Sequence, residues 1–274
     1  MTEIHETTDG TRALGEAPGK GDAFARLVLE TMPEESRVGL TLGFVRTFGI
    51  PGIARVLHST GRMTDEPRGR AKATGVAMFA LIGQGVASAE GRRIVEGLRR
   101  IHDRPDITPE LMRYVLACFT VCPLRFIDDH GHRAVTDEER DAAYAFHLGL
   151  SDALGLSEDA EDTGHTGDGT EDTEGTAPGG AGLAGVERWM RAYESRHFAP
   201  SPEGGALWAA TSKGLLAARL PRPLAALAPA VAASLLDEPL RTALRVRRAP
   251  APVRALVTAA LRARARARRR RTTA

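Results

Sequence analysis

Apolar residues recur along most of this chain at the three- and four-residue spacing of amphipathic helices. Glycine and proline interrupt the pattern repeatedly, and both residues are common where helices end. No run of alternating β-branched residues predicts a strand. We therefore expect an all-α fold, built as a single globular multi-helix domain. The expected helices cover residues 22–32, 38–57 with a break at 49–51, 67–85, 88–103, 108–123, 136–154 and several segments from 186 to the C-terminus.

Local signals mark the ends of two of these helices. Thr108 followed by Pro109 has the pattern of an N-cap followed by proline at the first helical position. Thr136 and Glu139 have the spacing of a capping box, which predicts a helix start at this point. Pro123 is expected to end the helix that begins at Thr108, because proline removes a backbone hydrogen bond.

Two polar segments fall outside the helical pattern. Residues 1–20 form a polar, glycine-containing tail, and residues 157–182 are rich in Asp, Glu, Gly and Thr without a hydrophobic period. Neither segment buries enough apolar surface to offset the entropy of ordering, so we expect both to be disordered. The expected organisation is one helical domain over residues 21–260, interrupted by the acidic insertion, and a basic C-terminal tail at residues 261–274.

Composition narrows the function classes only slightly. The formal net charge of +2 gives no general attraction to nucleic acid, and 274 residues are enough to bury a core that encloses a cofactor. Cys118 and Cys122 lie one helical turn apart, and we expect two buried thiols rather than a disulfide or a zinc site. The polar N-terminus lacks an apolar leader, and no uncharged run reaches the length of a membrane span, so we expect a cytoplasmic protein.

Four residues on the third and fourth expected helices are candidates for chemistry. Arg70 and Thr74 are four apart and project from one face of a largely apolar helix, where a polar pair costs free energy unless something polar meets it. His102 ends an apolar stripe on the next helix, and Arg99 precedes it by three residues. Neutral imidazole binds iron well, so His102 is a candidate haem ligand. The alternative is a hydrogen-bonded core histidine or a cation at a helix C-terminus.

The order of short motifs along the chain favours the haem interpretation. In sequence they are Arg70 and Thr74, Glu90–Ile94, Leu98–His102, Ile107–Glu110 with Tyr114–Leu116, Pro123–Phe126, Gly131–Arg133, Thr136–Glu139 and Trp189–Glu194. This series resembles the family of MpaB-type oxygenases and bacterial rubber oxygenases, which are also called latex clearing proteins. That family has an Arg and a Thr four apart on one helix, an Arg-x-x-His on the next, and later a Tyr-Glu helix and a proline-rich helical tail. The resemblance covers roughly residues 25–260.

The resemblance implies a haem b-dependent oxygenase with His102 as the iron ligand. It implies that Arg70 and Thr74 form the catalytic pair on the oxygen side, and that Arg99 lies near a haem propionate or supports the site. The helical domain is then expected to enclose a cavity for haem and for a hydrophobic substrate that reacts with dioxygen. Rubber oxygenases carry a lysine where this chain has Ala73, so we expect a small isoprenoid or other lipid-like alkene instead of rubber.

Three other histidine-containing segments are weaker candidates. Residues 128–132 read Asp-Asp-His-Gly-His, which suggests a metal site or a polar turn, and we favour the turn. His147 lines the haem pocket or packs in the core, and we favour the core. Arg55 and Ser59 flank His58 as an alternative arginine–hydroxyl pair, but residues downstream of them do not match the family in register.

Two further segments have structural interpretations. We expect Trp189, Tyr193 and Glu194 to be structural, with the tyrosine or the glutamate bracing a buried arginine. The basic run from Arg262 to Arg271 is expected to be solvated, with contact to an anionic lipid surface, to the acidic insertion or to nucleic acid as alternatives. We expect no specific nucleic-acid binding, because no basic recognition helix is evident near the N-terminus. A non-catalytic helical ligand-binding module or a nucleic-acid-associated protein remains the alternative function.

Overall fold

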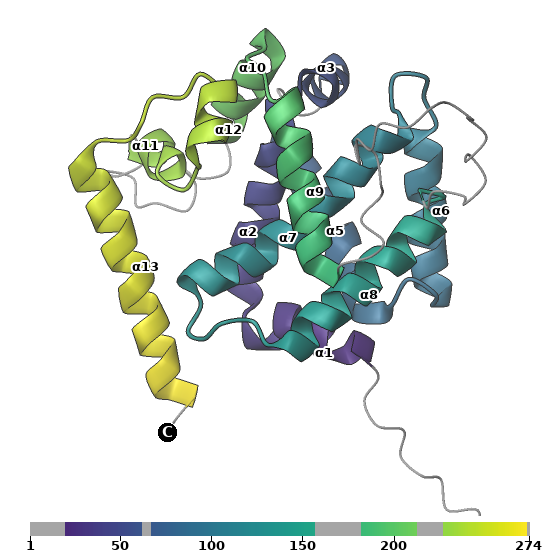
Figure 1. The fold of residues 1–274 in the computed structure, drawn as a ribbon, viewed down its shortest axis with the longest axis horizontal. Helices are drawn as coiled ribbons and strands as arrows, with labels where there is room; N and C mark the ends of the chain where they lie inside the picture. Colours follow the sequence, from purple (N-terminus) through teal and green to yellow (C-terminus); the bar gives the residue numbers. More distant parts are fainter. Residues whose placement is uncertain (1–19, 62–66, 157–181, 213–226, 273–274) are drawn as a thin grey trace, which may run out of the picture.

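The computed structural model describes residues 20–61, 67–156, 182–212 and 227–272, and within them every regular element is a helix (Figure 1). The all-α prediction is therefore confirmed for this part of the chain. The tail at residues 1–19 and the insertion at residues 157–181 lie outside the described residues. The helices are α1 (Lys20–Arg26), a π-helical turn η1 (Leu27–Thr31), α2 (Pro33–Arg46), a 3-10 turn η2 (Thr47–Gly49), α3 (Pro51–Ser59), α5 (Pro67–Gln84), α6 (Ala89–His102), α7 (Pro109–His130), α8 (Asp137–Ala153), α9 (Gly182–His197), α10 (Pro202–Thr211), α11 (Ala228–Ala233), α12 (Glu238–Ala243) and α13 (Ala251–Thr272).

Helices α2 and α7 cross at the centre of the molecule and pack closely on each other. Their backbones approach at two glycines of α2. A Cβ atom on Gly39 would overlap the Cα atom of Pro123, and one on Gly43 would lie 2.6 Å from the carbonyl oxygen of Cys118. Only glycine permits this separation, so the central contact depends on two residues without side chains.

The prediction that Pro123 ends its helix is wrong. Helix α7 continues through Pro123 to His130. Proline costs a helix interior about 3 kcal/mol. The residues after it, Leu124, Phe126 and Ile127, are all buried in the core, and burying each such side chain contributes about 1.5–3 kcal/mol. Packing therefore outweighs the local cost.

The predicted helix starts are confirmed at three positions. The side chain of Ser88 accepts a hydrogen bond from the amide of Gly91 (2.9 Å) and begins α6. Thr108 caps α7 in the same way. Thr136 and Glu139 form the complete capping box of α8, in which each side chain accepts a hydrogen bond from the backbone amide of the other residue.

A buried ionic network joins α2, α7 and α9. The Arg46 guanidinium donates two hydrogen bonds to the Glu194 carboxylate, one of them from Nη2 at 2.6 Å. The Tyr114 hydroxyl donates to the same carboxylate (3.0 Å), and Arg46 also donates to Asp237 (2.7 Å). The expectation that Glu194 braces a buried arginine is confirmed, and Tyr193 stacks on Tyr114 beside the pair.

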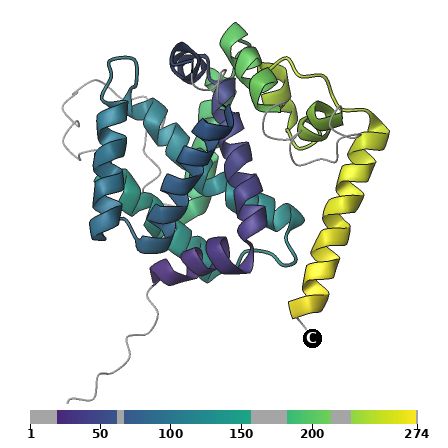
Figure 2. The same cartoon turned by 180° about the vertical axis from the view of Figure 1, so that it is seen from behind.

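The remaining helices flank this centre on two sides. Helix α1 packs on α8 at one end, α6 lies at one flank, and the long α13 lies at the opposite flank (Figures 1 and 2). The basic run that sequence analysis treated as a tail is the C-terminal half of α13. Of the described helices, none alone is long and apolar enough to cross a membrane, whereas the bent pair Pro33–Gly49 and Pro51–Ser59 reaches the required length and composition together.

Candidate functional site

A cavity of about 410 Å³ lies between α3, α5, α6 and α7. Its volume is within the ~300–1,000 Å³ of ligand-binding pockets. The walls are mostly apolar, and the polar groups among them are three threonines, His102 and Arg104. The apolar side chains include Phe44, Ile53, Met78, Leu98, Leu111 and Phe119. Apolar walls with a few polar groups are typical of sites that bind an organic molecule or a cofactor.

His102 is the last residue of α6, and its half-buried ring lines this cavity. Its Nδ1 atom lies 2.7 Å from the carbonyl oxygen of Leu98, one turn earlier in the helix. With the proton on Nδ1, the ring donates to this carbonyl, and the basic lone pair belongs to Nε2. Metal-bound histidines commonly have this arrangement, because the hydrogen bond fixes the tautomer and the orientation of the ring.

Thr74 lines the cavity from α5, so the structure brings two of the predicted site residues to one space. Ala73 lines it as well, whereas the neighbouring Lys72 is exposed and is not part of the wall. The position where rubber oxygenases carry a lysine thus presents a methyl group here. The backbone of Arg70 belongs to α5, one turn before Thr74, but its side chain lies outside the described residues.

Arg99 does not line the cavity. Its side chain is exposed, and its Nη2 atom would lie 3.6 Å from a Cβ atom built on Gly155, just after α8. The arginine of the cavity wall is Arg104, whose guanidinium pairs with Asp106 through hydrogen bonds of 2.9 and 2.7 Å. Sequence reasoning missed Arg104, although its position two residues after His102 was a signal.

The weaker candidates have structural roles. His147 is buried, its Nδ1 atom lies 3.2 Å from the Thr120 hydroxyl, and burial lowers its pKa to about 4. The Arg55, His58 and Ser59 side chains are exposed and do not line the cavity. The interpretation of His147 as a core residue is therefore confirmed.

The acidic and histidine-rich segment at residues 128–132 forms the end of α7, up to His130, and the start of the turn that leads to α8. Asp128 accepts hydrogen bonds from the amide of Val135 (2.9 Å) and from Arg140 (2.7 Å), so its carboxylate organises the turn. In the part of the chain that the structure describes, no group of three or more His, Cys, Asp and Glu side chains is placed to hold a metal ion. A haem held by one histidine does not require such a group. Cys118 and Cys122 are buried free thiols, as expected.

Comparison with known proteins connects this chain to a family of oxygenases. The family described as "ER-bound oxygenase mpaB/B'/Rubber oxygenase, catalytic domain" matches residues 35–267. The ER-bound oxygenase mpaB' of Penicillium brevicompactum is 29% identical over 217 residues, which are 76% of this chain and 48% of that protein. The ER-bound oxygenase mpaB is 30% identical over 168 residues in Penicillium brevicompactum and in Penicillium roqueforti, or 58% of this chain in both comparisons and 40% and 52% of those proteins.

The chain thus spans about half the length of the curated relatives it matches. The match includes α2 to α12 and most of α13, and therefore every helix that lines the cavity. The family assignment agrees with the order of motifs along the chain. The chain belongs to the family of ER-bound oxygenases mpaB/B' and rubber oxygenases, over the catalytic domain that this family shares.

Proposed function

We propose that this protein is a haem b-dependent oxygenase that combines dioxygen with a small hydrophobic substrate in the cavity between α3, α5, α6 and α7. The observation that carries the proposal is that His102 and Thr74, from two successive helices, line the same apolar cavity. The membership of an oxygenase family gives the class of reaction. The donor set fits haem: one imidazole, hydrogen-bonded through Nδ1, within apolar walls.

His102 would hold the iron through Nε2, and the Leu98 carbonyl would keep the ring in the tautomer that this requires. Haem b, when bound, supplies the redox chemistry that activates dioxygen. The Thr74 hydroxyl is a hydrogen-bond donor in the wall, suited to orient an oxygen atom of the reactants. We propose Arg70 as the second member of the catalytic pair, because its backbone lies one turn before Thr74 on α5.

The two arginines near His102 have different proposed roles. Arg104 in the cavity wall is placed to pair with an anionic group, such as a propionate. This new ion pair would replace the one that Arg104 forms with Asp106. Arg99 is outside the wall, and its guanidinium lies close to Gly155 just after α8, a position suited to holding the end of α6. Arg99 is therefore proposed as a positioning residue.

The cavity wall also suggests the substrate class. Leu, Ile, Met and Phe side chains exclude water and favour an apolar molecule. With Ala73 in place of a lysine, this part of the wall has no cationic group for a charged substrate. An isoprenoid or other lipid-like alkene meets both conditions.

The test is incorporation of labelled oxygen. The haem-loaded protein is supplied with ¹⁸O₂ and a panel of small isoprenoid alkenes, and products are examined by mass spectrometry. We expect the wild type to add ¹⁸O to at least one alkene and His102→Ala to add none. A haem-loaded wild type that consumes no dioxygen with any alkene of the panel, and adds no label, would contradict the oxygenase assignment.

A further inference from the structure

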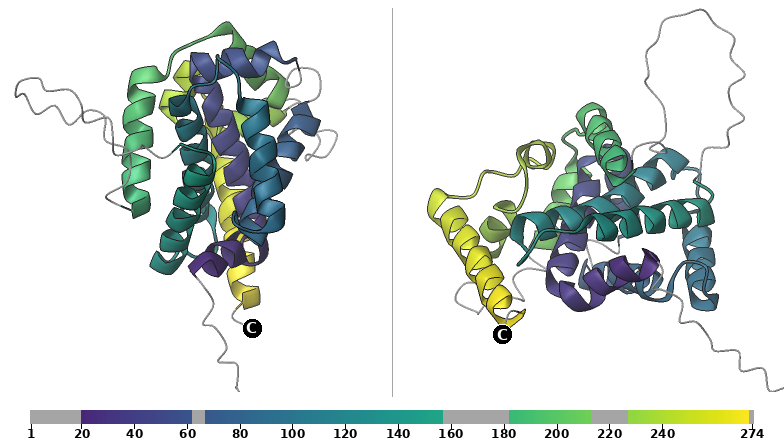
Figure 3. Two further views of the ribbon diagram at one scale, coloured as in Figure 1. Left: turned by 90° about the vertical axis from the view of Figure 1, so that its right-hand side faces the viewer. Right: turned by 60° about the horizontal axis from the view of Figure 1, so that its bottom comes forward.

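A second, larger hollow lies on the other side of α2, away from the cavity. It is a groove of about 620 Å³ between α13 and the helices α2 and α11. The right view of Figure 3 shows α13 along one flank and α6 at the opposite one. The groove is lined mainly by apolar side chains, which include Val38, Leu42, Val45, Trp208, Val231 and Leu256.

Large apolar side chains are left in contact with solvent along this groove. Leu256 of α13 is 67% exposed and Leu227 is 41% exposed. Contiguous apolar surface of this kind costs free energy in water and is often a binding site. The groove therefore has the size and the surface of a site for an apolar chain.

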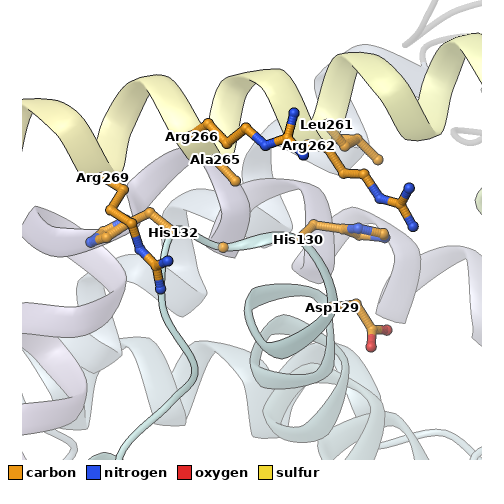
Figure 4. A pocket seen from close by; sticks show the side chains of 9 residues that line it. Asp129, His130, His132, Leu261, Arg262, Ala265, Arg266 and Arg269 are labelled. Atoms are coloured by element: carbon orange, nitrogen blue, oxygen red, sulfur yellow. The ribbon is translucent and has the colours of Figure 1, made fainter.

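A cationic pocket of about 240 Å³ adjoins the groove, because His130 and Leu261 line both. Figure 4 shows the side chain of Arg262 near the imidazole of His130, the last residue of α7, and Arg266 one turn further along α13. Arg269 and His132 lie at the other end of the pocket. The one carboxylate of the lining, that of Asp129, points away from α13.

Four arginines of α13 form two pairs with different surroundings. Arg264 and Arg268 face the buried carboxylate of Glu35, at 3.4 and 3.8 Å, and attach the helix to the body of the protein. Arg262 and Arg266 are each two residues away from this pair, so they project from the other side of the helix, and they have no carboxylate within ion-pair distance among the described residues. Positive charges gathered without a counter-charge favour an anion between them.

We propose that the groove and its cationic pocket together bind a single-chain lipid with a phosphate headgroup. The chain lies in the apolar groove, and the phosphate lies between Arg262, Arg266 and His130, at the end of the pocket nearest the groove. Guanidinium groups suit phosphate because they donate several hydrogen bonds in a fixed plane. From the sequence, the Arg262–Arg271 run was expected to be solvated, with contact to an anionic lipid as an alternative. The proposed headgroup site replaces the solvated interpretation with that alternative, beside an apolar groove that nucleic acid would not fill.

Trp208 provides a direct readout, because it lines the groove. The chain has two tryptophans, so Trp189→Phe leaves Trp208 as the only one. The probe is a lysophosphatidate whose acyl chain carries bromine, which quenches tryptophan fluorescence on contact. We expect saturable quenching of Trp208 at lipid concentrations below micelle formation. The uncharged monoacylglycerol with the same brominated chain is expected to bind at least about tenfold more weakly, since it lacks charge-assisted hydrogen bonds.

Variants of the arginines distinguish recognition of the headgroup from a general effect of positive charge. In the Trp189→Phe background, the pair Arg262→Gln and Arg266→Gln removes the unpaired cations and is expected to weaken binding by about tenfold or more. The matched control, Arg247→Gln with Arg248→Gln, removes two exposed positive charges just before α13 and is expected to leave binding unchanged. Ala260→Phe fills the groove from α13 without changing charge, and it is expected to weaken lipid binding.

Several outcomes would overturn the proposal. Equal quenching by monoacylglycerol would mean that the headgroup is not recognised. Equal weakening by the control pair would mean that only net charge matters. Quenching by vesicles but not by dispersed lipid would indicate attachment to a bilayer surface. Displacement of the lipid by inorganic phosphate at the lipid's own concentration would indicate a free-phosphate site. Thermal unfolding of every variant checks that the fold is kept.

Discussion

The guanidinium of Arg46 and the carboxylate of Glu194 form a buried ion pair between residues 148 positions apart in the sequence. Burial opposes the charge on Arg46, but hydrogen bonds to Glu194 and the charges of Glu194 and Asp237 keep its pKa above the ordinary value. The pair therefore holds α2 and α9 together as charged groups, and removal of one partner would leave the other buried and uncompensated.

We expect Glu194→Gln to lower the free energy of unfolding by about 3 kcal/mol, because the Arg46 charge loses its main partner. Glu96→Gln is the control: it breaks the exposed pair with Arg100, whose side chains are 73% and 74% exposed, and is expected to cost less than about 1 kcal/mol. Urea denaturation measures both variants. Equal losses in the two variants would contradict a special role for the buried pair.

Alanine is expected to have opposite effects on stability at Gly39, which lies in the contact between α2 and α7, and at Gly149, which lies outside it. Gly39→Ala is expected to destabilise the protein by about 1–3 kcal/mol, since the new methyl group would overlap Pro123. A Cβ atom on Gly149 of α8 would meet nothing within 4 Å, so Gly149→Ala is expected to stabilise the helix by about 0.5–1 kcal/mol. Thermal and urea unfolding distinguish the two. A neutral Gly39→Ala would mean that α2 and α7 are further apart.

His147 predicts a pH dependence of stability. Burial lowers its pKa from 6.5 to about 4, so the unfolded chain binds the proton more readily than the folded one between these values. The stability contributed by the neutral form is complete above pH 6.5 and is lost as the pH falls towards 4. The shift corresponds to about 3 kcal/mol. His130 and His132 have lowered pKa values and act in the same direction.

The measurement is the free energy of unfolding from pH 7.5 to pH 4 in wild type and in His147→Gln, which keeps a polar group near Thr120. The difference between the two proteins is expected to change with pH in the window between 6.5 and 4. Parallel curves for the two proteins would show that His147 does not contribute.

Replacement of Thr74 is expected to slow the reaction without a loss of bound haem. Thr74→Val keeps the shape of the side chain and removes its hydroxyl, so we expect dioxygen-dependent turnover to fall by about tenfold or more with an unchanged haem content. Thr60→Val changes another threonine of the same wall, whose hydroxyl donates to the Leu57 carbonyl (2.9 Å), and is expected to have little effect. If the two variants lose turnover equally, Thr74 has no particular role.

Much of the fold was predictable because its signals are local. The caps at Thr108 and Thr136 predicted the starts of α7 and α8 within one residue, and the helical period alone predicted that of α6. The continuation of α7 past Pro123 was not predictable, because it depends on packing against α2. Local propensity carries no information about a partner helix that lies far away in the sequence.

The candidate site was predictable only where its residues belong to local motifs in the sequence. The motif order identified His102 and Thr74, and the structure brings both to one cavity. Thr60 and the apolar wall from α3 were missed, since only the tertiary arrangement brings these segments beside α6, whereas Arg104 was missed although it directly follows that helix. Arg99 was chosen from the motif, but the turn of the helix directs it towards Gly155. The separation of four α13 arginines into two pairs likewise depends on Glu35, a residue near the other end of the chain.

The most direct test of the central claim is an absorption spectrum of the protein purified from cells supplied with a haem precursor. Three proteins are compared: wild type, His102→Ala, and His58→Ala, which removes an exposed histidine outside the cavity. We expect a Soret band with about one haem per chain in wild type and His58→Ala, and its loss in His102→Ala, whose fold is checked by circular dichroism. A folded wild type without a Soret band, or a His102→Ala variant with an unchanged band, would contradict His102 as the ligand of a haem.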